Sequence, residues 1–72
     1  MHMCYNFIVE FEVMKGLGPD FVTKLVDVGY DDVDADVPEY VVREWAKKDA
    51  EAHLKRLGSE IEKFMFVDIH NA

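Results

Sequence analysis

Residues 5–13 carry the pattern that most constrains the fold of this chain. Apolar side chains stand at every second position, and three of the four positions between them are polar. A period of two is typical of a strand that buries one face. The alternating apolar residues are Tyr5, Phe7, Val9, Phe11 and Val13. A domain built on this strand needs a second layer to cover that face.

One helix is predicted over about residues 38–57. Asp36 stands at the N-cap position, Pro38 suits the first turn, and Glu39 takes the capping-box position. Gly58 follows as the stop signal. An apolar stripe with small alanines runs along the helix and would let it lie close on a sheet. The stripe consists of Val42, Ala46, Ala50, Leu54 and Leu57, with Val41 and Trp45 at its margin.

Three other segments complete the predicted element order. Residues 15–20 are rich in glycine and proline and are expected to form a hairpin connection. Residues 21–30 are ambiguous, since their β-branched content favours a strand whereas Asp20 and Gly29 could delimit a helix. We favour the strand. Residues 61–69 are predicted to form the last strand, with Phe64, Phe66 and Asp68 on one face and Met65, Val67 and Ile69 on the other.

These elements predict a single α+β domain over residues 1–72, in which residues 1–2 are a tag remnant without a structural role. The predicted order is ββαβ, with a three-stranded antiparallel sheet of order 2-1-3 and the helix packed on one face. A helical segment 21–30 would give βααβ instead. The uncovered face of the sheet is expected to present Ile8, Phe64 and Phe66 to water, which is typical of a contact surface.

Charge and cysteine content restrict the partners and the compartment. The formal net charge is −7, which repels phosphate backbones and anionic lipid, so we expect no direct binding of nucleic acid or membrane. A basic protein surface is favoured as the partner. Cys4 is the only cysteine, which rules out an internal disulfide and fits a reducing cytoplasm. No apolar run approaches the roughly 20 residues that span a bilayer.

The sequence predicts no catalytic, cofactor or metal site. Asp32, Asp34 and Asp36 have the alternating carboxylates of a calcium loop. Val37 and Arg43, however, stand where an EF-hand requires glycine and glutamate. His53 and His70 have no second histidine or cysteine at ligand spacing, so both are interpreted as structural. The chain is therefore expected not to be an enzyme.

An acidic cluster and the uncovered sheet face supply the candidate partner-binding residues. Opposite-charge steering would speed association with a basic groove. The candidates are Asp27, Asp31, Asp32, Asp34, Asp36 and Glu39 from the acidic cluster, and Ile8, Phe64 and Phe66 from the sheet face. The alternative is a structural protein that forms a homodimer through the apolar sheet face.

The chain resembles many small acidic proteins encoded by phages in the arrangement of its elements. The resemblance rests on the segment Val33-Asp34-Ala35-Asp36, on the helix with Ala46 and Ala50, and on the final strand over residues 61–69. Among these are compact polymerase inhibitors of lytic phages. The resemblance implies a protein that binds a host enzyme, such as one that processes nucleic acid or acts in defence, and blocks it. It implies no individual binding residue.

Overall fold

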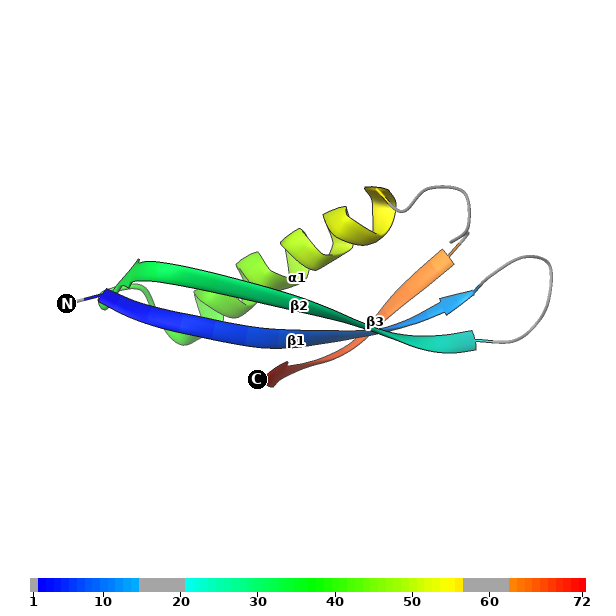
Figure 1. The fold of residues 1–72 in the computed structure, drawn as a ribbon, viewed down its shortest axis with the longest axis horizontal. Helices are drawn as coiled ribbons and strands as arrows, with labels where there is room; N and C mark the ends of the chain where they lie inside the picture. Colours follow the sequence, from blue (N-terminus) through cyan, green and yellow to red (C-terminus); the bar gives the residue numbers. More distant parts are fainter. Residues whose placement is uncertain (1, 15–20, 57–62) are drawn as a thin grey trace.

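The computed structural model describes residues 2–14, 21–56 and 63–72. Its elements, in chain order, are β1 (His2–Met14), β2 (Phe21–Asp34), α1 (Glu39–Arg56) and β3 (Lys63–Asn71). The strands form one antiparallel sheet of order β2-β1-β3, and α1 crosses one face of it (Figure 1). The predicted α+β fold with ββαβ order is confirmed. Residues 21–30 are strand, and the hairpin connection predicted at residues 15–20 lies outside the described residues.

The core lies between β1 and α1. Phe7, Val9, Phe11 and Val13 of β1 are buried, as the alternation predicts. The apolar stripe of α1 packs against these side chains through residues that are at most 1% exposed, namely Val42, Ala46, Ala50 and Leu54. Leu57, the last residue of the predicted stripe, lies outside the described residues. Trp45 lies at the margin and is 39% exposed. The two alanines let the helix lie close to the sheet, so that the large side chains of β1 fill the layer between them.

A β-bulge in β3 reverses the predicted faces of Phe64 and Phe66. Glu10 of β1 is opposite Asp68, whereas the next residue, Phe11, is opposite Phe66, so Val67 is the extra residue in β3. Directly opposite residues of an antiparallel pair point to the same face. Phe64 and Phe66 therefore pack against the core, where both ring edges meet Phe11. Their predicted exposure on the uncovered face is wrong.

A second irregularity extends β2 beyond the predicted strand. Tyr5 is opposite Tyr30 and Met3 is opposite Val33, which leaves one extra residue in β2. Asp32 adopts a positive φ of 56° there, a conformation that aspartate tolerates better than most residues. The shift lets Val33 become buried beside the half-buried Tyr30. His2, expected to have no structural role, pairs with Asp34, and Met3 pairs with Val33.

The turn before α1 is organised by Asp34 rather than by Asp36. The backbone N–H of Asp36 donates to Asp34 Oδ1 at 3.0 Å, and the N–H of Val37 donates to the Asp34 carbonyl at 3.0 Å. The first helical bond runs from Val42 N–H to the carbonyl of Pro38. No hydrogen bond from the Asp36 carboxylate to the helix is present among the described residues, so the capping role predicted for Asp36 is wrong.

Candidate protein-binding surface

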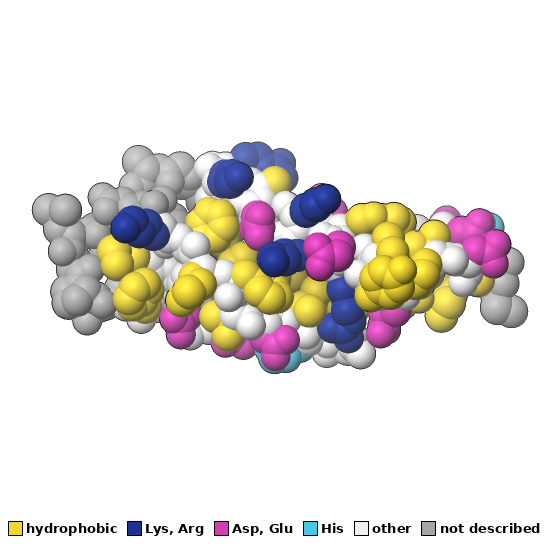
Figure 2. Space-filling model, turned by 180° about the vertical axis from the view of Figure 1, so that it is seen from behind, with side chains coloured by type: hydrophobic (Ala, Val, Ile, Leu, Met, Phe, Trp, Pro, Cys, Tyr) yellow, Lys and Arg dark blue, Asp and Glu magenta, His cyan; other side chains and the backbone are white. Residues whose placement is uncertain are grey.

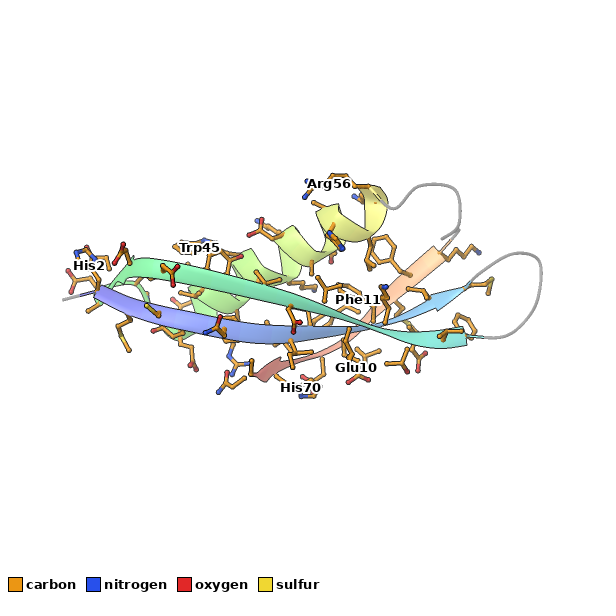
Figure 3. The ribbon with its side chains drawn as sticks, in the orientation of Figure 1. His2, Glu10, Phe11, Trp45, Arg56 and His70 are labelled. Carbon is orange, nitrogen blue, oxygen red and sulfur yellow. The ribbon has the colours of Figure 1, made fainter. Side chains whose placement is uncertain are left out.

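The sheet face turned away from α1 is uncovered, and we call it the open face. Cross-strand pairing decides which side chains share it. Figure 3 shows Glu10 and His70 on this side of the sheet, whereas Phe11 lies on the side of α1. The open face consists of Asn6, Ile8, Glu10, Glu12 and Met14 from β1, of Phe21, Thr23, Leu25, Asp27 and Gly29 from β2, and of Lys63, Met65, Asp68 and His70 from β3.

Carboxylates dominate the polar part of the open face. Asp27 stands opposite Ile8, and Asp68 stands opposite Glu10. The Nε2 of His70 lies 3.0 Å from Oε1 of Glu10, a contact that holds this carboxylate in place. Lys63, at the end of β3, is the one lysine or arginine that the described part of the chain contributes to this face. The open face is therefore an acidic surface.

Exposed apolar side chains alternate with these carboxylates. Leu25 lies opposite Glu10 and is 56% exposed, and Met65 lies opposite Glu12 and is 55% exposed. Phe21 is similarly exposed opposite Met14. Ile8, the predicted apolar contact, is half-buried on the same face. Exposed apolar groups that are bordered by polar residues are typical of a contact surface.

The acidic cluster predicted from sequence is divided by the fold. Asp27 lies on the open face, in the middle of β2. The other members lie at the end of the molecule where β2 turns into α1, and Figure 2 shows acidic side chains beside a histidine at that end. These members are Asp31, Asp32, Asp34, Asp36 and Glu39, all exposed. Among residues 2–14, 21–56 and 63–72, no three histidine, cysteine, aspartate or glutamate side chains converge as metal ligands would.

The side of α1 carries most of the positive charge. The helix contributes Arg43, Lys47, Lys48, Lys55 and Arg56. Two of these cations lie over aromatic rings of the sheet, Arg43 at 5.3 Å from the centroid of Phe7 and Lys47 at 4.5 Å from that of Phe66. The helix also carries four carboxylates, Glu39, Glu44, Asp49 and Glu51. The side of α1 therefore has mixed charge, whereas the open face is predominantly acidic.

Tyr30 joins β2 to the side of the helix. Its hydroxyl donates to the carboxylate of Asp49, and its ring meets the edge of Trp45 with centroids 5.9 Å apart. Burial first, and then the hydrogen bond and charge of Asp49, raise the pKa of Tyr30 well above its ordinary value of 10.0. The neutral phenol thus helps to hold the helix on the sheet.

The raised pKa of Tyr30 predicts a loss of stability at alkaline pH. The folded state binds the phenolic proton more tightly than the unfolded chain, so its contribution is complete below about pH 10 and is lost as the pH rises further. Urea unfolding from pH 8 to pH 11 should show that the free energy of unfolding falls more steeply in the wild type than in Tyr30→Phe. Tyr40→Phe, at a residue 71% exposed, should follow the wild type. Equal slopes for wild type and Tyr30→Phe would contradict the assignment.

Several residues of the open face are not among those predicted from sequence. Met65 is missed because its exposure follows from the bulge at Val67. Leu25 and Phe21 lie on the face opposite to Val26 and Val28, so the alternation of the favoured strand over residues 21–30 already contained the signal for them. Phe64 and Phe66, predicted in their place, belong to the core margin.

Comparisons with known proteins identify no relative. No protein-family model, no curated protein and no solved structure matches the chain. No helix within the described residues is long and apolar enough to cross a bilayer.

Proposed function

We propose that this chain is a non-enzymatic protein-binding module, and that its open face binds a basic protein surface. The observation that carries the proposal is the interleaving of exposed apolar groups with carboxylates on this face. Two exposed apolar side chains lie directly opposite carboxylates of β1, Leu25 opposite Glu10 and Met65 opposite Glu12. The apolar groups supply affinity when they are removed from water on binding. The carboxylates supply steering and select against acidic partners.

The chemistry of the partner follows from this pattern. It needs an apolar patch bordered by lysine and arginine side chains, as on the nucleic-acid-binding groove of an enzyme. A chain that occupies such a groove blocks it, which is the inhibitory role implied by the resemblance to small phage proteins. The net charge of −7 argues against direct binding to nucleic acid. The exposed free thiol of Cys4 supports a reducing cytoplasm as the compartment.

Charge favours a different protein over a second copy on the open face. Two copies stacked through this face would bring their carboxylates at Glu10, Asp27 and Asp68 against one another. Like charges in contact destabilise an interface by up to several kcal/mol. Phe64 and Phe66, which the homodimer alternative relied on, pack against the core and are not available for that contact. The open face is therefore assigned to a partner of opposite charge.

The test compares partner capture by the wild type with capture by a variant whose open face carries added positive charge, called the reversed variant below. In Leu25→Lys/Met65→Lys, two exposed apolar groups become cations. Tyr40→Lys makes the same chemical change at an exposed site on α1 and serves as the control. Proteins from a lysate of the cells that express the chain are captured on each immobilised variant and quantified, and the principal one is purified and titrated.

We expect a partner with a basic surface that binds the wild type and Tyr40→Lys equally, and that binds the reversed variant at least about tenfold more weakly, a difference of about 1.4 kcal/mol. Raising the salt to about 0.5 M should slow association. Capture that is unchanged by the reversal, or a principal partner with an acidic surface, would overturn the proposal.

A further inference from the structure

The outer edge of β2 is a long strand edge without a neighbour. β1 pairs with β2 on one side only, and no other strand in the described part of the chain lies beyond it. β2 has 14 residues, so its outward N–H and C=O groups form a long row of unpaired hydrogen-bonding groups. Such a row is a template for pairing with another strand.

The other edge of the sheet is protected in ways that residues 21–30 of β2 are not. β3 has only 9 residues and is interrupted by the bulge at Val67. The guanidinium of Arg43 also donates to the carbonyl of Ile69 at 3.2 Å and to Asn71 Oδ1 at 2.9 Å. Bulges, short strands and covering side chains are the usual means of blocking an edge. Across residues 21–30 the pairing of β2 is regular, and no side chain of the described residues bonds to its backbone.

A cavity of about 380 Å³ runs beside this free edge. It is lined by residues 24–29 of β2 and by Asp49, His53 and Arg56 of α1. Within β2 the one lysine or arginine is Lys24, near the start of the strand, whereas Asp27 lies in the middle and the exposed Asp31 and Asp32 lie near the end. The helix adds both Arg56 and Asp49 to the lining, so it contributes no net sign of charge. The edge of β2 therefore runs from a cation at Lys24 to an acidic end. An antiparallel copy of the same edge presents the opposite order of charge.

From this complementarity we infer that two copies of the chain associate through their β2 strands. The strands pair antiparallel across a twofold axis perpendicular to the sheet, which joins the two sheets into one of six strands. Both helices then lie on the same face, and the two open faces form one continuous surface. The inference does not depend on the proposed partner, because it uses the strand edge and leaves the open face free.

Charge selects the register of this pairing. With Val28 on the axis, Lys24 meets the aspartates at residues 31–32 of the other copy, and Asp27 meets Gly29. An axis through Asp27 would place the two Asp27 side chains opposite each other, and an axis through Gly29 would place Asp27 opposite Asp31. Like charges directly opposite destabilise a strand pair. An axis through Val26 would leave Lys24 opposite an apolar residue.

Disulfide trapping tests this register. In a Cys4→Ser background, which removes the native exposed thiol, Val28→Cys places two thiols on the axis with Cα atoms about 5 Å apart, within disulfide range. Leu25→Cys is the control, because its two Cα atoms would be about 20 Å apart at about 3.3 Å per residue. Under mild oxidation Val28→Cys should cross-link to a dimer at least about tenfold faster than Leu25→Cys.

Sedimentation equilibrium of the native chain provides the second measurement. At about 0.15 M salt, where screening acts over about 8 Å, we expect a mass twice the 8.4 kDa of the chain. Lys24→Glu should raise the dissociation constant about tenfold, whereas Lys48→Glu, the same charge change on α1, should leave it unchanged. A monomer across the concentration range, or faster cross-linking through Leu25→Cys, would overturn the inference.

Discussion

Phe11→Ala is expected to lower the free energy of unfolding by about 3–5 kcal/mol. Phe11 is completely buried, and its ring meets the edges of Phe64 at 5.7 Å and Phe66 at 6.1 Å between centroids. Truncation removes these contacts and leaves a cavity between β1, β3 and α1. Because a single core in a domain of about 70–80 residues or fewer rarely supplies more than about 3–5 kcal/mol, the variant should be partly or wholly unfolded at physiological temperature.

Urea unfolding followed by circular dichroism measures this loss. Phe21→Ala is the matched control, since it removes the same side chain from a position that is 53% exposed. We expect the control to change the free energy of unfolding by at most about 1 kcal/mol. Similar losses at the two positions would show that Phe11 is not the centre of the core that the structure describes.

Arg43→Ala is expected to cost about 1.5–3 kcal/mol and to loosen the end of β3. The guanidinium holds the Ile69 carbonyl and Asn71, and it lies over the ring of Phe7. It also forms an ion pair with Glu39 at 3.6 Å, which adds little because the carboxylate is largely exposed. The removal leaves the carbonyl without its donor at the margin of the core.

Two measurements separate this role from a general effect of charge. Urea unfolding gives the loss of stability, and hydrogen exchange of the β3 amides reports the local opening. Arg43→Lys keeps the charge but lacks the planar fork that reaches both acceptors, so it should recover only part of the loss. Lys48→Ala, at an exposed position of the same helix, should be near neutral. Full recovery by Arg43→Lys would mean that charge alone matters.

The open face links the predicted fold to the proposed function. The set of side chains on the open face depends on two local features, the strand over residues 21–30 and the bulge at Val67. If the β2 edges pair as inferred, two open faces with the same charge pattern become one surface. A basic partner of sufficient length would then bind both copies, and the second contact would form at a high effective concentration.

The amino-acid sequence by itself determined the first strand, the helix and the last strand of this protein, and it favoured the strand at residues 21–30 without excluding a helix there. The period of two over residues 5–13 and the helical stripe from Val42 to Leu54 are local patterns that correspond directly to buried faces. The ββαβ order then leaves few sheet topologies, and the simplest of them, with β1 in the centre, is the one observed.

Only the tertiary structure decided which side chains of β3 reach the open face. A bulge inserts one residue into a strand and exchanges the faces of every residue beyond it, and its position depends on pairing with the neighbouring strand. The alternation within β3 therefore misplaced Phe64 and Phe66, which the bulge at Val67 turns toward Phe11. The same bulge made Met65, rather than these phenylalanines, the exposed apolar group that β3 adds to the open face, beside Leu25 of β2.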